Sequence, residues 1–112
     1  MKQEFKIISD FIEKNTRVLD VGCGDGTLMQ FLQSNKQIDI RGIEISKENS
    51  QKCVGKGLTV IEGDAEKDLY QFPDGSFDFV ILSQTLQAFL NPEIVIQELL
   101  RVGKKAIVTV PN

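Results

Sequence analysis

The sequence contains no histidine and no tryptophan, and only two cysteines. Histidine is the commonest general base and metal ligand in proteins, so its absence argues against zinc enzymes and Ser-His-Asp hydrolases, and we expect no metal site. Cys23 and Cys53 form no CxxC pair, and the charged N-terminal segment MKQEFKIISDFIEK does not have the pattern of a signal peptide. These features indicate reduced thiols in a cytoplasmic protein.

Positive charge is also scarce, with 13 Lys and Arg against 16 Asp and Glu and a pI near 4.9. Proteins that bind nucleic acid or a membrane surface need clustered basic residues, so we expect neither partner. No apolar run approaches the roughly 20 residues of a membrane span. The 112 residues, 41% of them hydrophobic, are enough for one globular domain over 1–112.

Segments with apolar residues at helical spacing alternate with short continuous apolar runs. We expect helices over 3–14, 28–35, 46–54 and 91–102, and strands over 17–21, 38–45, 58–61, 77–83 and 106–110. Gly103 is expected to close the last helix. This alternation is typical of an α/β fold, a Rossmann-like doubly wound parallel sheet, and the crossover rule predicts the strand order 3-2-1-4-5. Tyr70 is expected to pack a short helix against the sheet, and the expected aromatic core is Phe5, Phe11, Phe31, Phe77 and Phe79.

The stretch VLDVGCGDG places three glycines where the first strand turns into the next helix. A dinucleotide fingerprint is G-x-G-x-x-G, but here the third glycine position is occupied by Thr27, and the pattern is G-x-G-x-G. Asp20 and Asp25 would also face a pyrophosphate with charge of the wrong sign. S-adenosylmethionine carries a sulfonium and an ammonium and no phosphate, so the turn favours this ligand over NAD.

Further acids follow the next two strands. Glu44 ends the second strand, at its exposed end, where a carboxylate can accept both ribose hydroxyls of an adenosine. Asp64 follows the third strand, where it could accept the adenine amino group. Each acid alone could be an ordinary solvated loop residue, but together with the glycine turn they indicate an adenosine site that includes the neighbours Ile45 and Ala65.

The motifs VLDVGCGDGTL, GIEI, VIEGDA and FDFVILSQTLQAFLNP resemble the class I S-adenosylmethionine-dependent methyltransferases. More narrowly, GCGDGTL, SQTLQA and RVGKKAIVTVPN resemble the MetW family of methionine-biosynthesis proteins, from the first helix to the last residue. The resemblance implies that Glu44 binds the ribose and Asp64 the adenine. It also implies that Ser83 and Gln84 line the pocket and that the methionine end is held by Asp20, Gly22, Gly24 and Gly26. Cys23 has no second thiol nearby in the sequence and no histidine to activate it, so we expect it to be a small residue that packs beside the ligand rather than a redox group.

The sequence departs from the methyltransferase pattern after the fifth strand. Those enzymes continue with a helix and an antiparallel pair of strands, which are missing here, so we expect a C-terminally truncated piece of a longer protein. The apolar segment AIVTV would then form an exposed sheet edge, which soluble proteins avoid. If the chain is not truncated, a partner or a second copy of the chain is expected to cover that edge.

Two functions remain open at this point. The first is methyl transfer from S-adenosylmethionine to an unidentified small molecule, with S-adenosylhomocysteine as product and no catalytic base identified. The second, implied by the resemblance to MetW, is a non-catalytic partner or regulator of homoserine O-acyltransferase in methionine biosynthesis. An NAD-dependent oxidoreductase is disfavoured by Thr27 and by the acidic turn.

Overall fold

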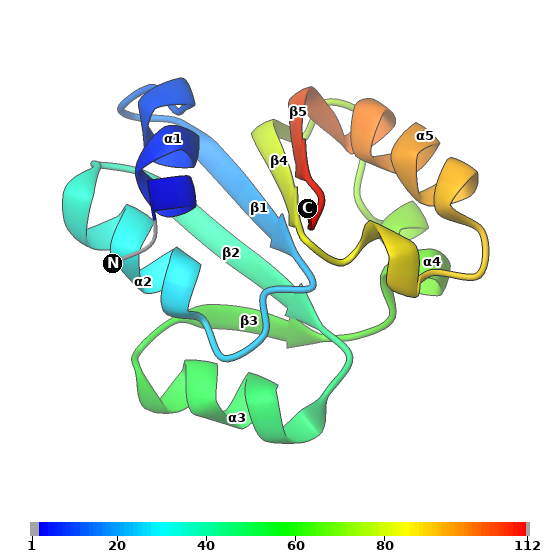
Figure 1. Ribbon diagram of the computed structural model, residues 1–112, viewed down its shortest axis with the longest axis horizontal. Helices are drawn as coiled ribbons and strands as arrows, with labels where there is room; N and C mark the ends of the chain where they lie inside the picture. The colour runs from blue at the N-terminus through cyan, green and yellow to red at the C-terminus, as the bar shows by residue number, and fades with distance from the viewer. Residues whose placement is uncertain (1–2, 112) are drawn as a thin grey trace.

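The computed structural model describes residues 3–111 and contains one sheet of five parallel strands (Figure 1). The strands are β1 (Arg17–Val21), β2 (Asp39–Glu44), β3 (Thr59–Glu62), β4 (Phe77–Ser83) and β5 (Gly103–Thr109). Their order across the sheet is β3-β2-β1-β4-β5, which confirms the predicted order. The glycine turn follows the central strand β1, so it lies where the order of the strands reverses, as open α/β sheets place their ligands.

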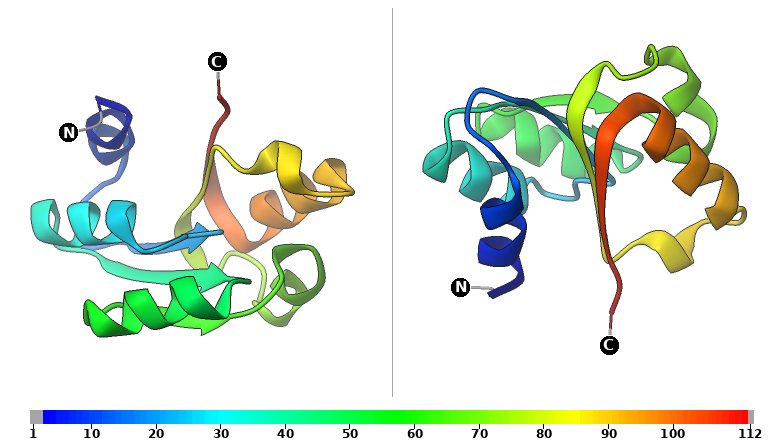
Figure 2. Two further views of the ribbon diagram at one scale, coloured as in Figure 1. Left: turned by 60° about the horizontal axis from the view of Figure 1, so that its bottom comes forward. Right: turned by 90° about the horizontal axis from the view of Figure 1, so that it is seen from above.

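Helices cover both faces of this sheet. The helices are α1 (Gln3–Phe11), α2 (Thr27–Asn35), α3 (Lys47–Gly55), α4 (Ala65–Asp68) and α5 (Pro92–Val102), with 3₁₀ turns at Leu69–Gln71 and Leu86–Ala88. Figure 2 shows α1 and α2 on one side of the strands and α5 on the other. Alternate residues of β1 follow this division, because Val18 is buried in the cluster under α1 and α2, whereas Leu19 is buried in the cluster under α5.

Gly103 closes α5 as predicted, since it is the residue after the last helical one and its N–H donates to the Leu99 carbonyl. It is also the first residue of β5, with extended backbone (φ −102°, ψ 144°). A Cβ atom at this position would lie 2.5 Å from Cγ2 of Val80 on the neighbouring strand. Glycine is therefore needed for close approach of β5 to β4. The strand accordingly begins three residues before Ala106 and ends at Thr109.

Two aromatic residues expected to pack inside the fold, one in the core and one against the sheet, are exposed. Phe11 is 65% exposed, because α1 ends there and its buried positions are occupied by Ile8 and then by Ile12 just after the helix. Tyr70 is 72% exposed, so it does not pack its 3₁₀ turn against the sheet; the neighbouring Leu69 is buried instead. The predicted core positions of Phe5, Phe77 and Phe79 are confirmed, and Phe31 is partly buried against the same cluster as Phe5.

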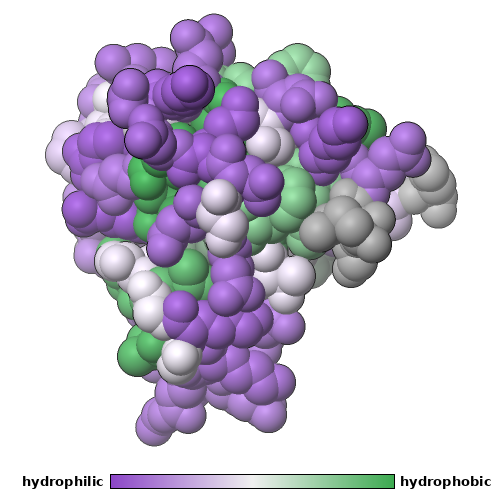
Figure 3. All heavy atoms as spheres, turned by 90° about the vertical axis from the view of Figure 1, so that its left-hand side faces the viewer, coloured by the Kyte–Doolittle hydropathy of each residue, from purple (hydrophilic) through white to green (hydrophobic). Residues whose placement is uncertain are grey.

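The face that carries α1 and α2 is covered mainly by hydrophilic side chains, with apolar side chains in small separate areas (Figure 3). Within residues 3–111, no helix is long and apolar enough to cross a bilayer.

Candidate functional site

Two cavities open at the carboxyl ends of the strands, and they meet at Gly22 and Gly24, which line both. The first cavity measures about 640 Å³ and lies between the start of α1, the glycine turn and the end of β4. The second measures about 400 Å³ and lies beyond the ends of β2 and β3. The first is lined by Gln3, Glu4, Phe5, Asp20, Gly22, Cys23, Gly24, Asp25, Thr27, Leu28, Ser83 and Gln84. The second is lined by Gly22, Gly24, Ile43, Glu44, Ile45, Asn49, Gly63, Asp64, Ala65, Glu66, Thr85, Ala88 and Phe89.

The glycine turn has a left-handed backbone at alternate residues. Gly22, Gly24 and Gly26 have φ values of 70°, 59° and 85°, a region that residues with a Cβ rarely adopt. The turn is tied to β2, because the backbone N–H groups of Gly22 and Cys23 both donate to the Ile43 carbonyl, at 2.8 and 3.2 Å. These hydrogen bonds therefore hold the turn in place between the two cavities.

Gly26 differs from the other two glycines because it lines neither cavity. A Cβ atom there would lie 2.5 Å from Cδ1 of Leu58 and 2.9 Å from Sγ of Cys53. Gly26 thus allows the turn to pack closely against α3 and the residues before β3. The geometry gives it a packing role, whereas Gly22 and Gly24 line the cavities.

Asp20 is an almost fully buried carboxylate at the first cavity. It is 2% exposed, and within residues 3–111 no group donates a hydrogen bond to it. Burial, and to a smaller extent the nearby charge of Glu44, raises the pKa of Asp20 to about 7. A buried carboxylate without a partner is costly, so this position favours a cationic or hydrogen-bond-donating ligand.

Glu44 is buried, contrary to the expectation of an acid at an exposed strand end. It is 7% exposed; its Oε1 accepts from the Gly24 N–H at 2.7 Å and its Oε2 from the Ser46 N–H at 2.9 Å. Glu44 therefore joins the glycine turn to the start of α3. A carboxylate has about four acceptor positions, so two remain that could accept from ribose hydroxyls in the second cavity.

The other residues predicted for the adenosine site also line the second cavity. Asp64 caps α4, with its Oδ1 accepting from the Glu66 N–H at 2.9 Å, and Ala65 is buried beside it. Ile45 is 66% exposed at the rim. The structure therefore brings together the ends of β2 and β3 as the sequence predicts.

Asp25 and Thr27 form the start of α2 at the edge of the first cavity. Both the N–H and the hydroxyl of Thr27 donate to Oδ1 of Asp25, at 3.1 and 2.6 Å, and these bonds lower the pKa of Asp25. Asp25 therefore remains charged at neutral pH. Its charge adds to the acidic lining, which includes no lysine or arginine among the described residues of either cavity.

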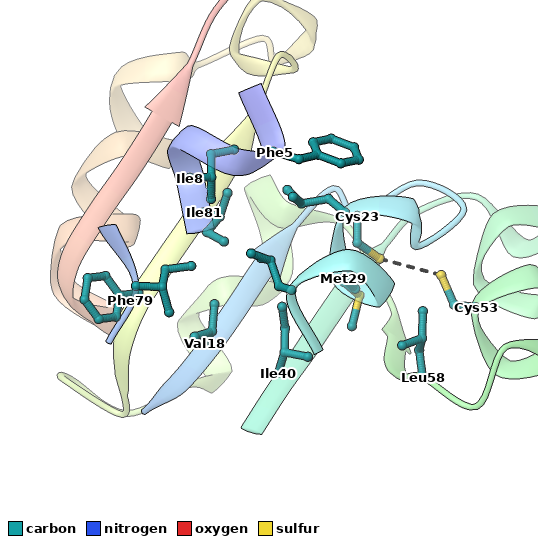
Figure 4. Close-up of a cluster of buried hydrophobic side chains, with 13 residues drawn as sticks. Phe5, Ile8, Val18, Cys23, Met29, Ile40, Cys53, Leu58, Phe79 and Ile81 are labelled. Carbon is teal, nitrogen blue, oxygen red and sulfur yellow. Dashed lines mark hydrogen bonds between the residues drawn. The ribbon is translucent and has the colours of Figure 1, made fainter. Parts of the chain in front are cut away.

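Cys23 and Cys53 lie close together behind the glycine turn. Their Sγ atoms are 4.0 Å apart (Figure 4), and the Cys53 thiol donates to the Gly24 carbonyl at 3.2 Å. Burial raises the pKa of both thiols, so both stay protonated at neutral pH. Cys23 fits closely against β2, since a Cβ atom on Gly42 would lie 2.7 Å from its sulfur.

Ser83 and Gln84 line the first cavity as predicted, but the residue that connects them was missed. Glu4 in α1 accepts a hydrogen bond from Nε2 of Gln84 at 2.6 Å and one from the Ser83 hydroxyl at 3.2 Å. Thr85 was also missed. It lines the second cavity, and its hydroxyl is buried without a partner in residues 3–111, near Gly22. No local pattern in the sequence distinguishes Glu4 from an ordinary surface acid of a helix.

The sheet order, together with paired cavities at a glycine turn after β1, defines the class I S-adenosylmethionine-dependent methyltransferase fold. A solved S-adenosylmethionine-dependent methyltransferase of Thermotoga maritima matches with a TM-score of 0.79 and 28% identity, over 94% of this chain and 48% of that one. A sequence model for the family described as methionine biosynthesis protein MetW matches residues 2–112. The chain belongs to the MetW family.

Three further proteins are similar to this chain over most of its length. The bifunctional methionine biosynthesis protein MetXA/MetW of Rhodopirellula baltica is 35% identical over 94% of this chain, which covers 18% of that protein. Ajmaline N-methyltransferase of Rauvolfia serpentina is 32% identical over 88% of this chain and 36% of its own length. The [4+2]-cyclase SpnF matches with a TM-score of 0.79 and 25% identity, over 90% of this chain and 40% of that one. The chain thus spans less than half the length of these relatives.

Proposed function

We propose that residues 1–112 form one domain that binds S-adenosylmethionine across the two cavities and supports methyl transfer to a small molecule. The methionine end would occupy the first cavity and the adenosine the second, with Gly22 and Gly24 between them. One observation carries the proposal: the described lining has six carboxylates and no basic side chain, so it suits a cationic ligand and repels a pyrophosphate. Those carboxylates are Glu4, Asp20 and Asp25 in the first cavity and Glu44, Asp64 and Glu66 in the second.

The donor set fits this ligand in size and chemistry. Asp20 lacks a partner and would meet the ammonium, while Glu44 keeps acceptor positions for the ribose hydroxyls. Asp64 and Ala65 line the part of the second cavity assigned to the adenine. When bound, the sulfonium supplies an activated methyl group. The residues of the chain would hold donor and acceptor in line, and such alignment can supply roughly 7–11 kcal/mol of a barrier without acid–base groups.

A thermal shift comparison tests the ligand assignment. At about a hundredfold excess over its Kd, S-adenosylhomocysteine should stabilise the protein by about 2.7 kcal/mol and raise its melting temperature, whereas NAD should not. A clear shift with NAD and none with S-adenosylhomocysteine would refute the proposal.

A second candidate function is a partner or regulator of homoserine O-acyltransferase that binds S-adenosylmethionine without consuming it. Two observations support it: a relative combines MetXA and MetW in one protein, and the SpnF likeness shows that the fold also serves a cyclase. Methyl transfer and acyltransferase activity should be assayed with each protein alone and with the two mixed. Acyltransferase activity that depends on this chain without methylated product favours the partner role, and methylated product from this chain alone favours the enzyme.

The edge of the sheet offers a surface for association. β5 is the last strand of the described sheet, and Val108 and Val110 are 38% and 59% exposed there. We propose that a homo-oligomer forms through this edge. Sedimentation analysis would test it, because a Val108→Lys variant should remain monomeric at concentrations at which the wild type associates.

A further inference from the structure

Glu4 connects the first helix to the ends of two strands. Its Oε1 accepts from Nε2 of Gln84 at 2.6 Å, and its Oε2 accepts from the Thr109 hydroxyl at 2.6 Å and from the Ser83 hydroxyl at 3.2 Å. The partners lie 79 to 105 positions away along the chain. A helix whose only task is to cover a core does not need a carboxylate with three donors at its first turn.

These bonds are concentrated at the first cavity. Glu4, Ser83 and Gln84 line it, whereas Thr109 is the last residue of β5 and does not line it. Gln84 is held twice, because its backbone N–H also donates to the Thr109 carbonyl at 2.8 Å. Its φ of 60° is a strained value for a residue other than glycine, which indicates that its surroundings enforce this conformation.

Asp20 supplies an independent sign that a ligand belongs in this cavity. Its carboxylate lines the same cavity, is almost completely buried and accepts no hydrogen bond from residues 3–111. A buried carboxylate in that state is stabilised when a cationic donor binds. The cavity therefore presents one carboxylate without a partner and a second one, Glu4, whose position is fixed by three donors.

The hydrogen bonds of Glu4 leave room for one more donor. A carboxylate has about four acceptor positions, and the chain fills three of them here. Because the three donors hold the carboxylate in place, a fourth donor from a ligand would meet a preorganised acceptor.

We propose that Glu4 binds the ammonium group at the amino-acid end of the nucleoside ligand and positions that end, both directly and by holding Gln84 against the first cavity. This inference rests on the proposed function, because it assigns the first cavity to the methionine end. Glu4 is then a determinant of specificity: it distinguishes a nucleoside with an amino-acid tail from one without it.

Two ligands separate this role from a structural one. S-adenosylhomocysteine carries the amino-acid end, and 5′-methylthioadenosine has the same adenosine and sulfur without it. Measured by calorimetry, the affinity of Glu4→Gln for S-adenosylhomocysteine should be about 10-fold lower than that of the wild type, which corresponds to about 1.4 kcal/mol. The same variant should change the affinity for 5′-methylthioadenosine by less than about twofold.

Two further variants make the test specific. Asp10→Asn makes the same carboxylate-to-amide change on an exposed part of α1 and should leave both affinities unchanged. Thr109→Val removes one donor to Glu4 without altering a residue that lines the cavity. It should lower the affinity for S-adenosylhomocysteine, by a smaller factor than Glu4→Gln does, and leave the affinity for 5′-methylthioadenosine unchanged. If Glu4→Gln does not fold, Thr109→Val still decides the question.

The outcomes separate the two proposals. Wild-type protein that binds neither nucleoside refutes the proposed function and this inference with it. In the other case, the wild type binds both nucleosides. If Glu4→Gln then weakens the affinity for both equally, or changes neither affinity, the role of Glu4 is refuted and the proposed function is not. Selective loss of S-adenosylhomocysteine in both variants supports the inference.

Discussion

The pKa of Asp20 gives the sharpest prediction about this site. In the unfolded chain the group titrates near 3.8, and in the folded protein near 7, because burial and Glu44 penalise its charge. Between these values the folded state binds more protons than the unfolded state, so the free energy of unfolding falls as pH rises from about 4 to 7. Above pH 7 both states are ionised and the full penalty applies.

The size of the effect follows from the two pKa values. Each pKa unit corresponds to about 1.4 kcal/mol, so ionised Asp20 costs the folded state up to about 4 kcal/mol at pH 8. Asp20→Asn keeps the shape and removes the charge. After an allowance for burying an amide without a partner, the variant should be about 1–3 kcal/mol more stable than the wild type at pH 8. At pH 4 the wild-type group is protonated when folded, and this advantage should disappear.

Urea unfolding at pH 4 and pH 8, with wild type and Asp20→Asn side by side, measures the effect. The difference in the free energy of unfolding between the two proteins is taken at each pH. Groups whose titration the substitution does not alter contribute equally to both proteins, so their contribution cancels. Equal pH dependence in the two proteins would show that Asp20 is not a buried, shifted carboxylate.

The same residue should make ligand binding release protons. An ammonium group beside Asp20 lowers the pKa of its carboxyl, and the group is about half protonated at pH 7, so binding of S-adenosylhomocysteine through its ammonium should release about half a proton. Calorimetry in two buffers of different ionisation enthalpy measures this number. Asp20→Asn should release none and should bind more weakly, by about 10-fold or more. Tight binding by the variant would exclude a contact between Asp20 and the ligand.

Three further predictions concern the surroundings of the cavities. Glu44→Ala should lower the free energy of unfolding by about 2–4 kcal/mol, because two backbone donors lose a charged acceptor; a loss below about 0.5 kcal/mol in urea unfolding would contradict the observed bonds. Gly26→Ala should destabilise the fold by about 2 kcal/mol or more through its positive φ and its contact with Leu58, while its folded fraction keeps the affinity for S-adenosylhomocysteine. Cys23 and Cys53 should react with a disulfide reagent at pH 8 at least about 10-fold more slowly than a free thiol such as glutathione, and rapid labelling would show that they are not buried and protonated.

The sequence was sufficient for features that depend on local patterns. Alternating helical and strand periodicity predicted the parallel order, and the acids that follow β2 and β3 were assigned to one cavity because carboxyl ends of parallel strands share an edge. Glu44 and Asp64 lie there as expected. What the pattern did not indicate is that Glu44 is already bonded to the glycine turn, since that contact depends on the three-dimensional path of the turn.

Features that depend on long-range packing could not be predicted. The bonds of Glu4 join positions 79 to 105 residues apart, and no periodicity signals them. The sequence predicts that Gly103 closes the last helix and that Gly26 belongs to the ligand-binding turn, but the space that excludes a Cβ at each is occupied by a side chain from a distant segment, Val80 for Gly103 and Leu58 for Gly26. Phe11 was placed in the core by its spacing, although α1 ends at that residue.

The hydrogen bonds of the glycine turn supply a physical reason why this loop suits a ligand without phosphate. In phosphate-binding turns the backbone N–H groups point at the anion. Here the N–H groups of Gly22 and Cys23 donate to β2, that of Gly24 donates to Glu44, and that of Gly26 donates within the turn. These donors are already bonded within the chain, and the acceptor of the Gly24 N–H is the Glu44 carboxylate. A pyrophosphate would therefore have to displace Glu44 and would be repelled by its negative charge. A nucleoside without phosphate need not displace Glu44, and its sulfonium and ammonium are attracted by the same carboxylates.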